Sequence, residues 1–517
     1  MSRFAHLAAW TLGIAAFGFF VIGGLLYSLP VGLDWSAYPL GGLIESLFRL
    51  FYHGPNAIAA VFWLAVALLG LIVVTYRFGS RPAAGTDATR RSVLRGGAAA
   101  FGATALASGI GGLRAFLGFG EKHGGWNTYL GNVQVPAVQT HPEYPEEWKG
   151  ARIDPDTGYR RLGRTHWPVS DIVVGAGRIG RLVGERKGVE IVRRAIDRGV
   201  NYVDTSPDYS ATGSESAVAD AIKGQRDRVF LATKFCTPWG HLGAGAPVAE
   251  YKRIIEESLA RLGTDYADLA HVHACDTVER LLDPNLHEAV DRLKQEGKLR
   301  YLGFSSHTPN LVEVVEAAID SGRFDVMMLA YHHGAWPEMP ALIDRAVAEQ
   351  DMGVVAMKTL KGAKHQDLTA FRDHAPAYSQ AALKWVLSNP NVSAAIISFF
   401  EFQHVDEYLQ ASGRRITPHD VSVLEEYDRQ IAGTHCTPHC GACLSSCPEQ
   451  LAIHDVLRHR MYFEDYGDEK EAMRLYAKLE KDASVCAGCS APCAGRCPVG
   501  IPIQERMAGA HSLLTLG

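Results

Sequence analysis

The sequence predicts an α/β protein in which a (β/α)8 TIM barrel follows transmembrane helices and precedes a small, cysteine-rich α-helical domain. Three observations support this prediction. Long uncharged runs occur near the N-terminus, short apolar strands alternate with amphipathic helices over residues 170–412, and eight of the ten cysteines follow residue 435. A chain of 517 residues is also too long for one ordinary domain and suggests about three units.

The composition is that of a protein with a large packed core. Hydrophobic residues make up 47% of the chain and aromatic residues 9%. The formal net charge is −5, so nothing favours a nucleic-acid partner, and we expect none. The clustering of the cysteines favours a metal site over a disulfide framework.

The N-terminal part is predicted to be a membrane anchor over residues 1–118. Residues 7–29 and 57–76 carry no charge, and each run has about the 20 residues that a helix needs to cross a bilayer. A helix satisfies its own backbone groups in lipid, so both runs can span it. A third apolar run, 96–113, is rich in glycine and alanine. The alternative for the first two runs is a pair of buried core helices.

The segment TRRSVLR at residues 89–95 precedes the third run and resembles a twin-arginine export signal, which moves proteins already folded. An ordinary basic flank is the alternative. The loop 77–95 contains five arginines and one aspartate and should therefore be cytoplasmic. A third crossing then makes this a multi-pass membrane protein whose residues after 118 lie outside the cytoplasm.

A linker rich in proline, glycine and charge covers residues 119–160, and the predicted barrel covers 161–430. Eight βα units over this length indicate a parallel barrel, in which the chemistry lies at the C-terminal ends of the strands. The segment GAGRIG at 175–180 has the spacing of a dinucleotide fingerprint but lacks a matching acidic residue, so we discount it. The predicted strands begin at about Asp171, Asn201, Val229, Ala267, Tyr301, Asp325, Gly353 and Val392.

Polar residues follow the predicted strands in a recognisable order. NYVDTSPDYS contains Asp204 and Tyr209, LATKF contains Lys234, and DYADLAHVHACD contains His273. This order resembles the Asp–Tyr–Lys–His tetrad of the aldo/keto reductases, which reduce carbonyls with hydride from a nicotinamide cofactor. The resemblance implies that the tyrosine donates a proton, that the lysine raises its acidity with the aspartate holding the lysine, and that the histidine hydrogen-bonds the carbonyl oxygen.

The same resemblance implies a set of cofactor contacts. GFSSHTP supplies Ser305 and, in place of the family's asparagine, Ser306. Tyr331 matches the tyrosine that stacks on the nicotinamide ring, and Lys358 lies near where phosphates bind, with Lys361 close to it in sequence. The remaining positions are Ser398, where the family has glycine, and Glu407 at its adenine contact. Because no Lys or Arg occurs from 391 to 412, we expect NAD(P)H with NADH favoured.

Three other residues near the predicted mouth have more than one interpretation. His271 has the same strand parity as His273, and we interpret it as a core histidine, with a second polar role as the alternative. Cys236 and Cys275 lie two residues beyond Lys234 and His273. They are either two small buried thiols, the commoner outcome, or a disulfide or redox pair.

The C-terminal segment 431–517 contains two cysteine quartets, each ending in Cys-Pro. They are close to the doubled bacterial ferredoxin pattern and imply two 4Fe-4S clusters, in which the fourth cysteine of each motif ligates the other cluster. Two zinc sites or disulfides are the alternatives. The tail as a whole resembles that of the ferredoxin-containing aldo/keto reductases. The predicted ligands are Cys436, Cys440, Cys443, Cys447, Cys486, Cys489, Cys493 and Cys497.

Two functions follow from these features. The first is a membrane-anchored oxidoreductase that interconverts a small carbonyl and an alcohol, with electrons passing through the clusters. The second is an electron-transfer module for a quinone, a cytochrome or a ferredoxin, in which the barrel no longer uses nicotinamide. A third idea is a metal-dependent hydrolase built from five histidines, namely His271, His273, His307, His332 and His333.

Overall fold

The computed structural model describes residues 137–140, 159–180, 183–335, 338–361 and 375–515. The predicted membrane helices at 7–29, 57–76 and 96–113, and the arginine motif at 89–95, lie outside these residues. Within the described ranges, no helix has the length and apolar character that a membrane crossing requires.

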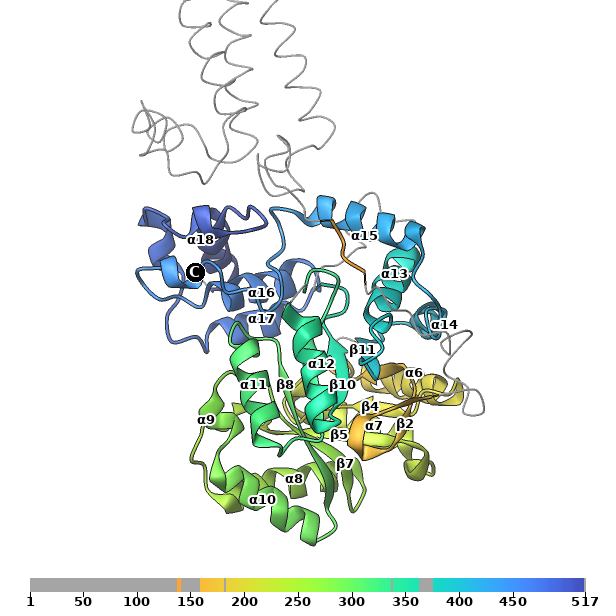
Figure 1. Cartoon of the computed structure of the whole chain (residues 1–517). Helices are drawn as coiled ribbons and strands as arrows, with labels where there is room; N and C mark the ends of the chain where they lie inside the picture. The colour runs from red at the N-terminus through yellow and green to blue at the C-terminus, as the bar shows by residue number, and fades with distance from the viewer. Residues whose placement is uncertain (1–136, 141–158, 181–182, 336–337, 362–374, 516–517) are drawn as a thin grey trace, which may run out of the picture.

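Eight parallel strands form a closed barrel, which confirms the predicted (β/α)8 fold (Figure 1). Each strand pairs with the next, and β11 returns to β3 with Ser398 beside Gly175. All eight begin within two residues of the predicted positions. The strands are β3 (Ile172–Gly175), β4 (Tyr202–Asp204), β5 (Phe230–Thr237), β7 (Ala267–Val272), β8 (Leu299–Ser306), β9 (Val326–Ala330), β10 (Gly353–Met357) and β11 (Ala394–Ser398).

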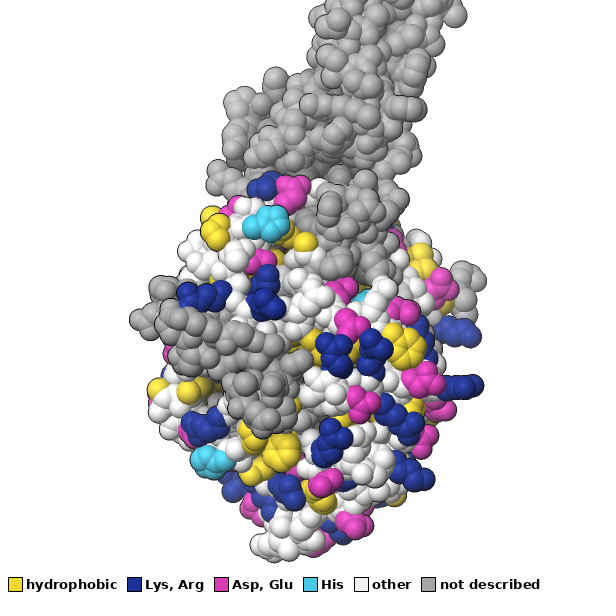
Figure 2. All heavy atoms as spheres, turned by 90° about the vertical axis from the view of Figure 1, so that its right-hand side faces the viewer, with side chains coloured by type: hydrophobic (Ala, Val, Ile, Leu, Met, Phe, Trp, Pro, Cys, Tyr) yellow, Lys and Arg dark blue, Asp and Glu magenta, His cyan; other side chains and the backbone are white. Residues whose placement is uncertain are grey.

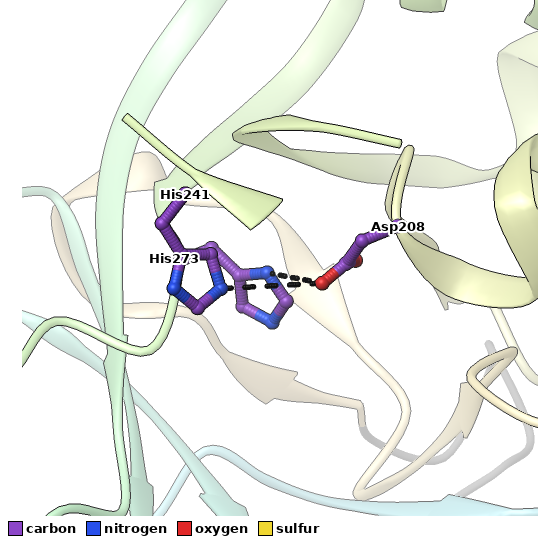
Figure 3. Close-up of side chains that lie close together, drawn as sticks. All are labelled: Asp208, His241 and His273. Carbon is purple, nitrogen blue, oxygen red and sulfur yellow. Dashed lines mark ion pairs between the residues drawn. The ribbon is translucent and has the colours of Figure 1, made fainter. Parts of the chain in front are cut away.

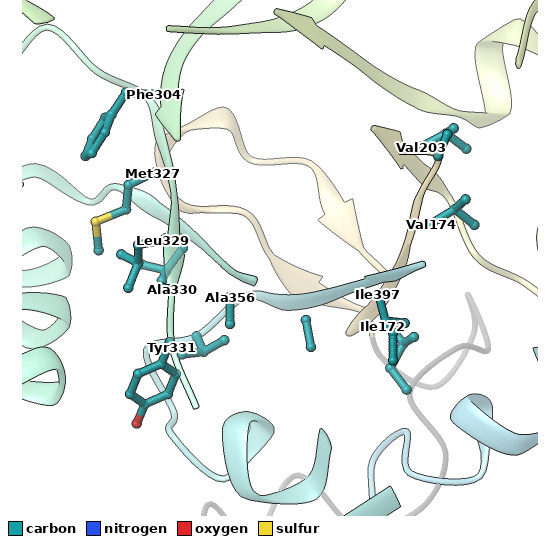
Figure 4. Close-up of a cluster of buried hydrophobic side chains, with 14 of the residues drawn as sticks. Ile172, Val174, Val203, Phe304, Met327, Leu329, Ala330, Tyr331, Ala356 and Ile397 are labelled. Carbon is teal, nitrogen blue, oxygen red and sulfur yellow. The ribbon is translucent and has the colours of Figure 1, made fainter. Parts of the chain in front are cut away.

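Amphipathic helices surround the barrel and bury their apolar faces against it. In α6, for example, Ile191, Val192 and Ala195 are fully buried while the arginines face outward. Figure 4 shows part of this outer apolar layer. The helices are α6 (Glu185–Asp197), α7 (Gly213–Ile222), α8 (Val248–Leu262), α9 (Val278–Leu281), α10 (Pro284–Gln295), α11 (Leu311–Ser321), α12 (Glu338–Gln350), α13 (Ala375–Leu387), α14 (Phe402–Leu409) and α15 (Pro418–Ile431).

A short hairpin of β1 (Arg160–Arg161) and β2 (Pro168–Val169) closes the N-terminal end of the barrel. Leu162, in the connection between the two strands of this hairpin, is fully buried and joins the apolar residues that fill the barrel axis. Gly163 has a φ of +48°, and a Cβ there would lie 2.2 Å from the backbone nitrogen of Gly353. Only glycine lets the hairpin approach β10 this closely.

The C-terminal module, defined here as residues 436–514, is helical and has its own apolar core. Its helices are α16 (Ile453–Glu464), α17 (Glu469–Tyr476) and α18 (Ile503–Leu514), with single turns η8 (Leu444–Ser446), η9 (Ser484–Gly488) and η10 (Ala494–Arg496) between them. Figure 1 shows the module on one end of the barrel, with α16 and α17 nearest to it. A separate core is what a distinct domain needs.

Figure 2 shows the face of the molecule on the right-hand side of Figure 1. Basic and acidic side chains are mixed over the described part of this face, without a large area of one sign. This mixed charge is the ordinary appearance of a solvent-facing surface.

Candidate active site

Two of the four tetrad residues form a buried ion pair at the C-terminal end of the strands. Asp204 ends β4, Lys234 lies in the neighbouring strand β5, and both are 1% exposed. The ammonium of Lys234 lies 2.5 Å from Asp204 Oδ2 and donates to the carbonyl oxygen of Thr205 at 2.8 Å. A buried lysine needs such partners, so Asp204 and the Thr205 carbonyl fix its position.

Tyr209 and His273 complete the group. The Lys234 ammonium lies over the Tyr209 ring, 4.7 Å from its centroid, and the ring meets that of His273 edge-on at 5.7 Å. The backbone after Tyr209 is left-handed at three consecutive non-glycine residues, with φ of 54°, 49° and 78° at residues 210–212. Such strain persists where surrounding contacts impose it. Here Ser210 Oγ donates to the carbonyl oxygen of Ile179 at 2.7 Å.

The surroundings of Tyr209 keep its phenol protonated before the reaction. Burial, together with the charges of Asp204 and Asp208, raises the pKa of Tyr209 well above its usual value. The Lys234 ammonium donates its hydrogen bonds to Asp204 Oδ2 and to the carbonyl oxygen of Thr205, rather than to the phenol oxygen. Tyr209 is therefore a neutral phenol at neutral pH, the form that can give a proton to a carbonyl oxygen.

His273 has a carboxylate partner that the sequence did not reveal (Figure 3). Its Nδ1 lies 3.2 Å from Asp208 Oδ2, and His241 Nε2 lies 4.0 Å from the same oxygen. Burial alone would raise the pKa of Asp208, but His273, Ser206 and His241 outweigh it and hold the pKa below its usual range. Burial and the charges of His273 and Arg280 lower the pKa of His241 to about 3. His241 is therefore a neutral imidazole at neutral pH, beside the ionised Asp208 carboxylate.

Asp208, His241 and His273 also offer three ligand atoms within 4.8 Å of one another. Among the described residues this is the one such group. Asp208 directly precedes Tyr209 in the sequence and could have been considered there. His241 lies in β6 (Gly240–His241), a hairpin extension of β5 that the strand pattern did not predict.

The other histidines do not converge, which argues against the hydrolase idea. His271 is fully buried inside the barrel, with Nε2 3.3 Å from the Tyr202 hydroxyl, as expected for a core histidine. A Cβ at the facing Gly303 would lie 2.5 Å from the His271 ring. His307 and His333 have partners in different elements, Arg458 of α16 and Asp428 of α15.

Cys236 and Cys275 are two buried free thiols, the commoner of the two expected outcomes. The Cys236 sulfur lies 3.1 Å from Ser206 Oγ, and the Cys275 thiol donates to the carbonyl oxygen of Thr277 at 3.4 Å. Burial raises the pKa of Cys275 to about 11, so this thiol is unreactive at neutral pH.

The two serines of the predicted cofactor loop are buried and bonded within the protein. Ser305 Oγ accepts from the backbone N–H of Ala274 at 3.0 Å, and Ser306 Oγ donates to the carbonyl oxygen of Cys275 at 2.8 Å. Ser305 shares the inward parity of Tyr301, whereas Ser306 points to the outer layer. Only Ser305 is therefore directed toward the mouth.

Three other predicted cofactor residues are buried, half-buried or already bonded to other side chains. Tyr331 is 1% exposed in the outer layer, where its ring packs 5.1 Å from that of Trp385. The Glu407 carboxylate accepts a hydrogen bond from Ser379 on α13. Ser398 ends β11, half-buried beside Gly175.

Both predicted phosphate-binding lysines have partners from later in the chain. Lys361 lies 2.6 Å from Asp428 Oδ1 on α15. Lys358 directly follows β10, in a left-handed conformation with φ of 56°, and hydrogen-bonds to Tyr462 of α16. Arg458 of the same helix donates to His307 Nδ1 at 2.7 Å. The C-terminal module therefore contacts the barrel mouth directly, which the sequence pattern did not predict.

The eight late cysteines fall into two groups in the structure, and all are free thiols. A cavity of about 20 Å³ is lined by Cys447 together with Cys486, Cys489 and Cys493. Burial raises the pKa of Cys436 to about 12, and the neighbouring thiols of Cys440, Cys497 and Cys443 contribute in the same direction. Each group thus takes three cysteines from one motif and the last from the other.

The barrel and its mouth have the features of a carbonyl-reducing enzyme, and comparison with known proteins agrees. The family model "Aldo/keto reductase family" matches residues 171–376. The uncharacterized oxidoreductase YqkF of Bacillus subtilis (strain 168) is 30% identical over 301 residues, which are 52% of this chain and 96% of that protein. L-galactose dehydrogenase of Arabidopsis thaliana is 26% identical over 280 residues, 49% of this chain and 87% of that protein.

A solved aldo-keto reductase from Klebsiella pneumoniae in complex with NADPH is 25% identical, with a TM-score of 0.42, and covers 52% of this chain and 95% of that one. The chain belongs to the aldo/keto reductase family and is an oxidoreductase of that type. These matches cover about half of its length.

Proposed function

We propose that the protein interconverts a small carbonyl compound and its alcohol at the barrel mouth and that it carries two 4Fe-4S clusters in its C-terminal module. The observation that carries the catalytic part is the convergence of Tyr209 with the Lys234–Asp204 pair and with His273. A nicotinamide nucleotide supplies the hydride in this chemistry. The relative named L-galactose dehydrogenase supports assaying alcohol oxidation as well as carbonyl reduction.

The chain's own residues supply the proton and the polar environment. Tyr209, a neutral phenol, gives its proton to the carbonyl oxygen as hydride arrives at the carbon. His273, positioned by Asp208, hydrogen-bonds the same oxygen while negative charge develops on it. Once Tyr209 has given up its proton, Lys234 stabilises the resulting phenolate, because the Lys234 ammonium already lies over the Tyr209 ring. The residues fit the nicotinamide only in part, since Ser305 faces the mouth and Tyr331 does not.

The cysteine grouping supports clusters rather than single zinc ions. Zinc bound by four thiolates has Zn–S distances of about 2.3 Å, which sets the sulfurs about 3.8 Å apart. Among the described residues, the one set of three close metal-ligand atoms is that of Asp208, His241 and His273, and it contains no cysteine. A cubane cluster takes thiolates that are farther apart, three from one motif and one from the other, and both groups have this composition.

We expect NADH to bind at least as well as NADPH. A 2′-phosphate needs a cationic partner, and residues 391–412 contain none. The arginines of α6 that reach α14 are already paired, since Arg194 and Arg198 both bond to Asp406. Titration of the purified protein with each nucleotide, followed by aldehyde reduction with each, measures the preference. A strong preference for NADPH would contradict this expectation.

A second candidate function is electron transfer without nicotinamide. The contacts of Lys358 with Tyr462 and of His307 with Arg458 favour it, because the C-terminal module then lies over the rim where a nucleotide would approach. A quinone, a cytochrome or a ferredoxin would be the redox partner. Failure of both nucleotides to bind, in protein that retains its iron, would favour this function over the first.

We also propose that the N-terminal segment anchors the chain in a membrane with the barrel outside the cytoplasm. The twin-arginine-like motif at 89–95 supports this, since clusters assembled in the cytoplasm require export of a folded protein. Protease added to spheroplasts should digest the barrel of the native protein and spare that of the Arg90→Lys/Arg91→Lys variant. A protected barrel in both proteins would place the enzyme in the cytoplasm.

A further inference from the structure

Two histidines and an aspartate meet at the barrel mouth, and the proposed reaction uses this group only in part. We call Asp208, His241 and His273 the Asp–His–His cluster. Asp208 Oδ2 lies 3.2 Å from His273 Nδ1 and 4.0 Å from His241 Nε2, and Figure 3 shows both rings presenting a nitrogen to this one oxygen. The two rings meet edge-on with their centroids 4.8 Å apart. The proposed reaction gives roles to Asp208 and His273 but none to His241.

The distances within the cluster are close to those of a metal site. A tetrahedral zinc ion with bonds of about 2.1 Å to nitrogen and oxygen sets its ligand atoms about 3.4 Å apart. One ligand atom from each of the three residues lies within 4.8 Å of the other two. The pair of Asp208 and His273, at 3.2 Å, is already at this separation, and that of Asp208 and His241 is at 4.0 Å. A small movement of the His241 side chain therefore completes the geometry.

The carboxylate of the cluster is oriented by a residue behind it. Ser206 Oγ donates to Asp208 Oδ1 at 2.5 Å, which leaves Oδ2 facing the two imidazoles. His273 Nδ1 is buried and makes no hydrogen bond of good geometry with any described residue, although Asp208 Oδ2 is near it. Metal ligands are commonly oriented by such hydrogen bonds from outside the ligand set. A bound ion would supply the partner that His273 Nδ1 lacks.

One arginine joins the two loops that carry the histidines. Arg280 of α9 donates to the carbonyl oxygen of His273 at 3.0 Å and to that of Leu242 at 3.2 Å. The backbones on which His241 and His273 depend are thus held together before any ligand binds. The His241 side chain is 35% exposed, whereas that of His273 is 12% exposed. An ion from solution can therefore reach the cluster from the side of His241.

The cations next to the cluster are neutralised by other carboxylates. Arg280 pairs with Asp276 at 2.6 Å, and Lys234 pairs with Asp204. Among the described residues, Asp208 forms ion pairs with the two histidines and with no lysine or arginine. Its negative charge therefore remains available to a cation bound between the imidazoles.

We propose that the Asp–His–His cluster binds a zinc ion and that the bound ion inhibits carbonyl reduction. Two imidazoles and a carboxylate are a known ligand set for zinc ions that keep a further position open, whereas magnesium and calcium prefer oxygen ligands. Ligation closes His241 and His273 on the ion and so withdraws His273 from the carbonyl oxygen. The inhibition rests on the proposed function, but the binding of zinc does not.

The test of binding is calorimetric titration of the full-length, anaerobically purified protein with zinc chloride. We expect the wild type to bind zinc and His241→Gln and Asp208→Asn to bind it at least about tenfold more weakly. His166→Gln is the matched control, because His166 is an exposed histidine in the hairpin at the closed end of the barrel. It should bind zinc as the wild type does. Magnesium chloride should give no binding that depends on His241.

The test of inhibition is aldehyde reduction with zinc added, each protein being compared with its own zinc-free rate. Zinc should inhibit the wild type at concentrations about tenfold or more below those that inhibit His241→Gln. Zinc that binds the cluster but leaves turnover unchanged, or raises it, would overturn the inhibitory role.

Iron content and circular dichroism show which variants are folded, and a misfolded Asp208→Asn leaves His241→Gln to decide. Equal zinc affinity in the wild type and in both cluster variants would place the ion elsewhere, such as on the cysteines, and would overturn the site. Absence of zinc binding by the wild type would overturn it as well. A protein that reduces no aldehyde would refute the proposed function, while the titration would still decide the site.

Discussion

Replacement of Tyr209 by phenylalanine should lower the rate of carbonyl reduction roughly a hundredfold or more, because the variant lacks the proton that the carbonyl oxygen must receive. The ring itself is kept, so its contacts with Lys234 and His273 remain. We therefore expect the fold and the iron content to be unchanged. Turnover of an aldehyde, measured together with nucleotide binding, distinguishes a lost proton donor from a lost cofactor.

Tyr301→Phe is the control for this experiment. Its hydroxyl donates to the carbonyl oxygen of Thr165 at 3.1 Å, at the hairpin end of the barrel and away from the tetrad. It removes one tyrosine hydroxyl from the same barrel and should leave turnover close to that of the wild type. Near-normal turnover by Tyr209→Phe would refute the assignment of Tyr209 as the acid.

Replacement of Cys447 by alanine should damage the cluster seated in the second motif, although Cys447 belongs to the first. Cys447 lines the same cavity as Cys486, Cys489 and Cys493. We expect the iron content to fall by up to half and the electron paramagnetic resonance signal of one reduced cluster to be lost. The companion variant Cys497→Ala should affect the other cluster.

Cys236→Ala serves as the control, since this thiol is buried in the barrel and is not a predicted ligand. Its iron content should equal that of the wild type. If Cys447→Ala and a variant of Cys436 damage the same cluster and spare the other, each quartet is local and the exchange between motifs is wrong.

The barrel and the tetrad could be predicted from the sequence because both depend on local patterns. Strand and helix periodicities locate the eight strand ends, and residues at successive ends of a parallel barrel meet at one mouth. Asp204, Tyr209, Lys234 and His273 are each tied to such an end. Their roles remain predictions, but their proximity follows from the fold.

The outward direction of Tyr331 has a simple physical cause. Val326 and Met328 face the barrel axis, so alternation along β9 directs residue 331 outward, toward Trp385. Parity alone could have revealed this. The contacts of Lys358 and His307 with α16 could not have been predicted, because they join residues about 100 or more positions apart and depend on how two separate cores meet.

The hairpin of β1 and β2 closes one end of the barrel to reactant and product. With Leu162 and the other apolar side chains filling the axis, nothing can pass from the far end of the barrel to Tyr209. Reactant and product must therefore enter and leave by the same rim, which the C-terminal module partly covers. Each product therefore has to leave through that rim before the next reactant can enter.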